Sequence, residues 1–195
     1  MKRPAAEIHA LLAAAHPEGI GELVAEAADA ANKNGAPRDA VSPVVAGKWL
    51  EVARTLRTHA DLQMDFLQCL TAVDWLKQGE IHVVYHLYSY VHRHAHVCRL
   101  VVPRDAARVP SVTSVWRTAD WLEREQYDLF GVVFEGHPDL RRLLMPDDWI
   151  GHPMRKDARE PRDYRGMSIQ RPNPLELVAL HDATRLGVQH EGSKK

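Results

Sequence analysis

Residues 66–102, FLQCLTAVDWLKQGEIHVVYHLYSYVHRHAHVCRLVV, decide the fold of this chain. Three runs rich in Val, Ile, Leu and Tyr follow one another there, at residues 67–75, 81–90 and 95–102. Such runs, separated by short polar segments, are typical of consecutive strands. In the second run, apolar residues alternate with more polar ones, and the apolar set is Ile81, Val83, Tyr85 and Leu87. This alternation predicts a sheet that is covered on one face.

The segments between the runs favour an antiparallel meander. Residues 77–80 and 92–94 are short enough for hairpin turns, and Pro103 ends the third run. A further short strand is expected at the sheet edge, over residues 41–45.

Helical patterns flank the predicted sheet. Residues 4–33 are rich in Ala, Glu and Leu and predict two helices, broken near residues 16–17. A third helix is indicated by four apolar residues at i, i+3, i+4 and i+7, namely Trp49, Val52, Ala53 and Leu56. Residues 111–130 return to helical composition, with Thr118 as N-cap and Gly131 as the C-terminal stop. The expected fold is α/β (α+β): a mixed, largely antiparallel sheet with helices packed on it.

Composition argues against a nucleic-acid-binding, a membrane-spanning and a disulfide-stabilised protein. The 195 residues carry 25 Lys and Arg against 26 Asp and Glu, so no basic field favours nucleic-acid binding. A membrane span needs roughly 20 consecutive apolar residues, and no run approaches this. The Ala-rich start imitates a signal peptide, but Glu7 and His9 interrupt it, so we interpret it as helix. Cys69 and Cys98 exclude a disulfide framework and a four-thiolate iron-sulfur site, and we expect reduced, buried thiols.

Charged and aromatic residues are most tightly interleaved over residues 123–144. On a helix, Arg124 and Asp128 are i, i+4 neighbours, and Glu125 could pair with a later arginine, which predicts a salt-bridged helix end. One functional alternative is acid-base catalysis by Glu125, Asp128 and His137, although a nucleophile, a phosphate loop and a metal set are missing from the sequence pattern. The other alternative is a docking surface. Most of the aromatic residues here are expected in the core: Trp116, Trp121, Tyr127, Phe130 and Phe134.

Twelve histidines raise the question of a metal site. His92, His94 and His96 would share one face of an extended strand, as three zinc ligands could. A fourth ligand at usual spacing is missing, and two arginines lie nearby, so we favour an exposed hairpin turn. His137 and His152, each preceded by Gly and followed by Pro, are expected to hydrogen-bond to backbone in turns.

The segment 123–157 resembles the 30-kDa subunit family of the proton-pumping NADH-quinone oxidoreductase, respiratory complex I. The matching positions are Glu123-Arg124-Glu125, Asp128-Leu129-Phe130, His137, Arg141, Leu143-Leu144 and Gly151-His152-Pro153-Met154-Arg155-Lys156-Asp157. Met154 replaces the family's common Leu, a swap that conserves volume. Upstream matches at 71–74 and 84–87 extend the resemblance to about residues 40–157.

The resemblance implies a structural subunit that binds no cofactor of its own. The flavin, iron-sulfur clusters and quinone would belong to partner subunits, chiefly the 49-kDa-type subunit and neighbouring iron-sulfur subunits. The complex would lie at the cytoplasmic face of the bacterial inner membrane, with this subunit attached peripherally. Interior ion pairs and subunit contacts are the implied roles of Glu123, Arg124, Glu125, Asp128, His137, Arg141, Arg155 and Asp157.

The expected organisation is an α/β domain over residues 1–157, with a helical extension at 1–35, followed by an extended docking arm at 158–195. The arm is rich in proline and in charges of both signs, too polar to form its own core. Two alternatives stay open. One is the equivalent subunit of a membrane-bound hydrogenase or another dehydrogenase complex. The other is a stand-alone enzyme that uses a metal or acid-base groups.

Overall fold

A computed structural model describes residues 3–24, 40–159, 161 and 163–168. The chain divides into two compact units, Met1–Ala158 and Arg159–Lys195. The described part of the second unit holds a small antiparallel hairpin of β7 (Asp163–Tyr164) and β8 (Met167–Ser168). All other described elements belong to the first unit.

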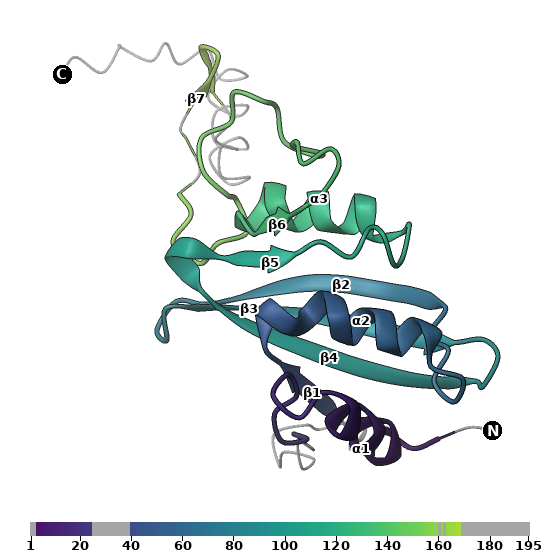
Figure 1. Cartoon of the computed structure of the whole chain (residues 1–195). Coiled ribbons are helices and arrows are strands. Elements are labelled where there is room, and N and C mark those ends of the chain that lie inside the picture. The colour runs from purple at the N-terminus through teal and green to yellow at the C-terminus, as the bar shows by residue number, and fades with distance from the viewer. Residues whose placement is uncertain (1–2, 25–39, 160, 162, 169–195) are drawn as a thin grey trace, which may run out of the picture. The chain divides into compact units, whose positions relative to one another are not determined.

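A four-stranded sheet with strand order β1-β4-β3-β2 forms the centre of the first unit (Figure 1). Its antiparallel part consists of β2 (Phe66–Trp75), β3 (Glu80–Ser89) and β4 (His94–Pro103). The short edge strand β1 (Val41–Val44) runs parallel to β4, so the sheet is mixed. The predicted strands, their order along the chain and the mixed, largely antiparallel character are confirmed.

Both hairpin turns contain a residue with positive φ. Gly79 has φ of 70° just before β3, a conformation that costs glycine little. Arg93, with φ of 55°, occupies the corresponding place before β4. The turns set the register, in which Trp75 pairs with Glu80 and Ser89 with His94.

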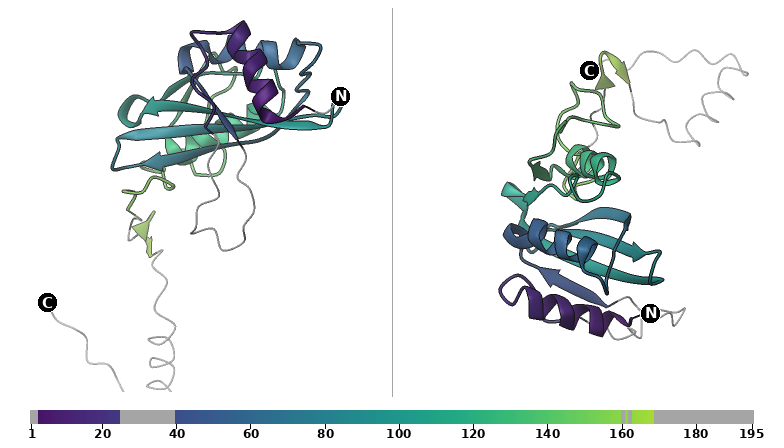
Figure 2. Two further views of the ribbon diagram at one scale, coloured as in Figure 1. Left: turned by 90° about the horizontal axis from the view of Figure 1, so that it is seen from below. Right: turned by 45° about the vertical axis from the view of Figure 1, so that its right-hand side comes forward.

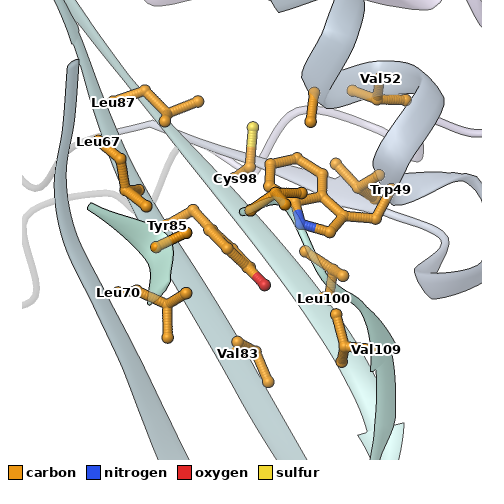
Figure 3. Packing of buried hydrophobic residues seen from close by; sticks show 14 of the residues in the cluster. Trp49, Val52, Leu67, Leu70, Val83, Tyr85, Leu87, Cys98, Leu100 and Val109 are labelled. Carbon is orange, nitrogen blue, oxygen red and sulfur yellow. The ribbon is translucent and has the colours of Figure 1, made fainter. Parts of the chain in front are cut away.

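One face of the sheet carries the core. α1 (Ala5–Ala15) and α2 (Trp49–Thr58), which follows the 3-10 turn η1 (Ala46–Lys48), lie on the same side of the strands (Figure 2). Trp49 packs on Tyr85 of β3 with 4.4 Å between ring centroids, and both side chains are fully buried (Figure 3). Burial of one large apolar side chain contributes roughly 1.5–3 kcal/mol, so this helix-sheet contact stabilises the core substantially. On β3, the residues of the opposite face are only partly buried.

The second N-terminal helix predicted within residues 4–33 is wrong for its described part. Residues 19–24 run extended along the free edge of β1, where the Gly21 amide donates to Pro43 O at 2.9 Å and Val24 exchanges hydrogen bonds with Val41. Two glycines, at 19 and 21, each disfavour a helix by about 1 kcal/mol, and the edge strand offers their backbone a partner. The remaining part of the predicted helix, 25–33, lies outside the described residues.

The chain then leaves the sheet through η2 (Arg104–Ala106) into a second layer. There β5 (Arg108–Pro110) pairs in parallel with β6 (Val133–Glu135), and α3 (Ala119–Phe130) lies between them in sequence. The predicted helix over 111–130 is shorter because residues 113–118 form turns, and the Thr118 hydroxyl donates to Leu67 O at 3.5 Å instead of capping α3. Gly131, at φ of 75°, ends α3 as predicted. Within the described residues, no helix has the length and apolar character of a membrane span.

Candidate functional site

The C-terminal end of α3 is enclosed by residues 137–157, a loop that we call the wrapping segment. This loop has little regular secondary structure, so its backbone needs partners from elsewhere. Its amides bind buried carboxylates and a carbonyl at the end of α3, and its carbonyls bind the guanidinium groups of Arg124 and Arg142. The family-like residues predicted from sequence lie mainly on α3 and on this loop.

Asp128 is the main anchor of the wrapping segment. Its carboxylate is fully buried, and Oδ2 accepts the amides of Leu143, Leu144 and Met145 at 3.1, 2.7 and 2.8 Å. Oδ1 accepts Nη1 of Arg142 at 2.7 Å. Burial opposes ionisation of Asp128, but these donors together outweigh it and hold the pKa of the carboxyl below its usual value. A single charge therefore fixes three consecutive peptide groups.

The last four carbonyls of α3 all have donors. Gly131 N–H donates to the carbonyl of residue 127, and the Met154 amide to that of residue 129. His152 Nδ1 lies 3.0 Å from the carbonyl oxygen of Asp128, and Arg155 Nε donates to the Phe130 oxygen at 2.7 Å. Carbonyls at a helix C-terminus carry partial negative charge, so a guanidinium is a favourable cap there. The wrapping segment thus completes α3.

A second buried carboxylate ties the wrapping segment to the sheet. Asp74, near the end of β2, forms a bidentate pair with Arg104, with Nε–Oδ1 of 2.7 Å and Nη2–Oδ2 of 3.1 Å. Its Oδ2 also accepts the Lys156 amide at 2.8 Å, while Arg104 contacts Asp157 as well. The Arg104 guanidinium holds the pKa of Asp74 below its usual range, against the effect of burial. β2, η2 and the end of the wrapping segment therefore meet at one ion-pair cluster.

Glu123 is a buried acid that no cation contacts among the residues described. Its carboxylate accepts the Ser111 hydroxyl at 2.7 Å and the Val112 amide at 2.8 Å, and its side chain is fully buried. Burial raises the pKa of Glu123 to about 7, while the two hydrogen bonds lower it in part and Asp120 raises it further. The residue holds the turn before α3 and stays partly protonated near neutrality.

Gln126 joins α3 to the outer edge of β2. Its side-chain nitrogen Nε2 donates to Leu70 O at 3.3 Å, and its side-chain oxygen Oε1 accepts a hydrogen bond from the Ala72 amide of β2. A cavity of about 300 Å³ lies beside it between β2 and α3, lined in part by Thr71, Asp74, Glu125 and Met154. Two acids line this cavity. Asp74 is already bound by Arg104 and the Lys156 amide, so Glu125 is the lining acid that could contact another molecule.

The predicted pairing of Arg124 with Asp128 is wrong. Arg124 Nε and Nη2 instead donate to the carbonyls of Arg141 and Arg142, at 3.3 Å each. Glu125 lies near Gln126 Nε2, at 3.4 Å, and no arginine contact to it is found among the described residues. Helical spacing makes Arg124 and Asp128 neighbours, but the wrapping segment supplies both with closer partners.

The acid-base set Glu125, Asp128 and His137 is not brought together. His137 Nε2 lies 3.1 Å from the Asp120 carbonyl, and its Nδ1 accepts the Asp139 amide at 3.0 Å. Both His137 ring nitrogens and His152 Nδ1 are therefore hydrogen-bonded to backbone, which confirms the backbone contacts predicted for the two Gly-His-Pro sites, although two of the three bonds go to α3. The Asp128 carboxylate is enclosed by four donors, so neither Asp128 nor His137 is placed to transfer a proton to a substrate.

The hairpin histidines are more buried than predicted. His94 and His96 are almost fully buried, with Nε2 atoms 2.9 Å from Leu62 O and from Ser42 Oγ respectively. His92 stacks on His94, with 5.4 Å between ring centroids. Burial lowers the pKa of His96 to about 4, so this ring is neutral at physiological pH. In the part of the chain that the structure describes, no group of three or more His, Cys, Asp or Glu is arranged to hold a metal ion.

The two thiols and the aromatic residues differ in exposure. Cys98 is buried, and burial raises its pKa to about 12, but Cys69 is exposed, so the prediction of two buried thiols is wrong for it. Cys69 lies at an irregularity of β2, where the pairing register between β2 and β3 shifts between Leu67 and Cys69. The aromatic prediction holds for Trp116, Phe130 and Phe134, which are buried, whereas Trp121 is 60% exposed under the Arg124 guanidinium.

Sequence reasoning missed three residues that organise this site. Arg104, Gln126 and Arg142 each reach partners that lie 14 to 56 residues away in the chain. Asp74 lies in the stretch 71–74 that resembles the 30-kDa subunit family, but the sequence pattern predicted no role for its side chain. A charged residue inside an otherwise apolar strand, as at Asp74, is the one signal that could have pointed to a buried pair.

Residues 43–164 match the model of a protein family described as the respiratory-chain NADH dehydrogenase, 30 Kd subunit. A NADH-quinone oxidoreductase subunit from Chloroherpeton thalassium is 42% identical over 122 residues, which is 62% of this chain and 50% of that protein. The subunit of the same name from Chlorobium phaeobacteroides is 41% identical over 125 residues, covering 63% and 74% of the two chains. The chain thus spans about half the length of the first of these relatives.

Two solved structures share the fold. The trypsin-resistant fragment (1-134) of Nqo5 is 26% identical, with a TM-score of 0.54 over 68% of this chain and 98% of that fragment. A chain of the membrane-bound sulfane sulfur reductase, an archaeal respiratory membrane complex, has a TM-score of 0.62 at 23% identity, over 97% and 95% of the chains. The family model covers more than half of this sequence, including β2, β3, β4, α3 and the wrapping segment. The chain therefore belongs to the family of the 30 Kd subunit of respiratory-chain NADH dehydrogenase.

Proposed function

We propose that this chain is a structural, non-catalytic subunit of the peripheral arm of a membrane-bound NADH-quinone oxidoreductase. In that complex, electron transfer from NADH to quinone is coupled to proton translocation. Membership of the 30 Kd subunit family is the observation that carries the proposal. It is supported by relatives more than 40% identical that are named as subunits of this oxidoreductase.

The chemistry of the site favours a scaffold over a catalyst. The buried carboxylates of Asp128 and Asp74 hold backbone amides and guanidinium groups, and Glu123 holds a turn. Groups committed in this way fix the shape of a surface. The family resemblance further implies that the flavin, the iron-sulfur clusters and the quinone belong to partner chains, chiefly the 49-kDa-type subunit and neighbouring iron-sulfur subunits. This chain would sit at the cytoplasmic face of the inner membrane and bind there through the complex.

Purification from native membranes tests this proposal. The tagged chain is isolated in mild detergent, and the proteins that accompany it are identified by mass spectrometry. We expect flavin, iron-sulfur and antiporter-like subunits, with an NADH-oxidising input module. An input module of the hydrogenase type would assign the chain to a related complex, and recovery of the chain alone from the soluble fraction would contradict the proposal.

Cofactor analysis of the isolated chain is a second test. The purified protein should lack visible absorbance from flavin or clusters and contain zinc at far below one equivalent. A stoichiometric metal or measurable turnover by the isolated chain would favour a stand-alone enzyme instead.

A further inference from the structure

The wrapping segment exposes apolar side chains that a loop would ordinarily keep sheltered. Ile150 is 95% exposed, and Leu144 and Met154 on the same segment are exposed by more than half. A single exposed apolar residue needs no explanation by itself. What distinguishes Ile150 is how firmly the backbone on each side of it is held.

Arg142 fixes the backbone on both sides of Ile150. Its Nη2 donates to the carbonyl of Trp149 at 3.0 Å and to that of Gly151 at 3.1 Å. The same guanidinium is bound to the buried Asp128 through Nη1 at 2.7 Å. The carbonyls of Trp149 and Gly151, one on each side of Ile150, are therefore tied through one planar cation to the interior of the first unit.

This arrangement presents an apolar side chain in a fixed position. Gly151 has φ of 81°, which turns the chain sharply directly after Ile150. A side chain on a backbone that is already ordered loses little entropy on binding, and such preorganisation favours affinity. The interaction hot spots of protein interfaces are residues of this kind, inserted into pockets of a partner.

Charge indicates what kind of partner fits. The cations Arg142 and Arg155 turn inward, to Asp128 and to the Phe130 carbonyl. The exposed residues just before Ile150 include the acid Asp147. An acidic group beside the apolar side chain disfavours an anionic lipid surface and favours a protein surface with basic side chains.

We propose that Ile150 is a preformed anchor that inserts into an apolar socket, bordered by Lys or Arg, on another protein subunit of the complex. The inference rests on the proposed function, because the socket belongs to a partner in that complex. It assigns a specific contact role to a residue outside the set singled out from sequence.

Photo-crosslinking in the assembled complex tests the contact. Ile150 is replaced by a benzophenone amino acid, and Val91, 64% exposed at the β3–β4 turn, receives the same replacement as a control. Complexes purified from native membranes are irradiated, and crosslinked peptides are sequenced. We expect position 150 to crosslink to one peptide of another subunit with Lys or Arg nearby, in higher yield than position 91. Crosslinks to lipid, to an acidic surface, or at the yield of position 91 would overturn the proposal.

A charge substitution provides an independent test. Ile150→Asp should reduce the amount of this chain in the purified complex by about tenfold or more, as expected at a hot spot, while Val91→Asp leaves it unchanged. Unfolding midpoints of both isolated variants should match the wild type because both positions are exposed. Normal incorporation of Ile150→Asp would refute the anchor, whereas absence of the wild-type chain from any such complex would refute the proposed function instead.

Discussion

The side chain of Gln126 takes the place of a neighbouring strand for Ala72. Its Oε1 accepts the Ala72 amide of β2 at 2.9 Å. Both residues are buried, and β2 is the last strand of the sheet at this edge. An uncovered edge strand invites pairing with other chains, so this contact protects the sheet as well as fixing α3.

Replacement of Gln126 by Leu should therefore destabilise the protein. The variant leaves the Ala72 amide and the Leu70 carbonyl buried without this partner, at a cost of about 1–3 kcal/mol. We expect a lower free energy of unfolding in urea and faster hydrogen exchange at the Ala72 amide. Glu125→Gln, at the adjacent position, should change stability by less than about 0.5 kcal/mol. Unchanged exchange at Ala72 in the Leu variant would contradict the edge-covering role.

Asp128→Asn should loosen the wrapping segment. The amide keeps the size of the side chain but removes the charge that binds Arg142 and three backbone amides, so we expect a loss of about 2–4 kcal/mol in urea unfolding. Asp139→Asn, which alters an exposed pair with Arg141, should cost less than about 0.5 kcal/mol. Equal effects of the two changes would argue against a special role for Asp128.

Glu123 should make the free energy of unfolding depend on pH between about 4.5 and 7. Its native pKa of about 7 lies above the ordinary value of 4.5, so unfolding releases a proton between these values. The free energy of unfolding should be highest, with respect to this group, below about pH 4.5 and fall as the pH rises to about 7. Glu123→Gln, which can still hydrogen-bond to Ser111 and Val112, should remove that fall and gain on the order of 2–3 kcal/mol at pH 8. The check is urea unfolding at several pH values, and a parallel pH dependence of the two proteins would contradict it.

The two thiols should react at very different rates. Under native conditions, iodoacetamide should label the exposed Cys69 more slowly than a free peptide thiol. Partial desolvation of the thiol and the nearby charge of Glu125 raise its pKa, and the thiolate is the reactive form. Cys98 should react only when the protein unfolds. Mass spectrometry of the labelled peptides measures both rates, and native labelling of Cys98 at the rate of Cys69 would show that the core opens readily.

Arg141→Glu should affect assembly more than folding. The Arg141 side chain is 71% exposed and pairs with Asp139, so its reversal should alter the unfolding free energy by less than about 1 kcal/mol. If Arg141 contacts a partner subunit, the fraction of chain recovered in the complex falls several-fold. Arg54→Glu, exposed on α2, serves as control. Normal recovery of the Arg141 variant would exclude this residue from the subunit contacts.

Local periodicity accounts for what could be predicted from the sequence. The alternation around Tyr85 and the helical spacing from Trp49 reflect burial within a single element, so each pattern identified its strand or helix correctly. The helix prediction for residues 19–24 is wrong because an extended strand partner, supplied by β1, outweighed the helical spacing of Ile20, Leu23 and Val24. Tertiary context overrides weak helix propensity in such cases.

The candidate site was harder to predict because its contacts join distant parts of the chain. Spacing rules place Arg124 beside Asp128, but they contain no information on a loop whose amides begin fifteen residues later. The pair of Asp74 and Arg104 spans thirty residues for the same reason. Resemblance to a family located the important segment, and only the three-dimensional structure assigned its partners.

Completion of α3 by the wrapping segment has a consequence for synthesis on the ribosome. The carbonyls of residues 128–130 and the carboxylate of Asp74 obtain their full set of donors only from residues 152–156. A nascent chain that has emerged only as far as α3 therefore carries an acid in β2 and a helix end that water must still solvate. We therefore expect the first unit to close late in translation, and a ribosome that stalls before residue 152 would release an incompletely closed product that quality-control proteases can recognise.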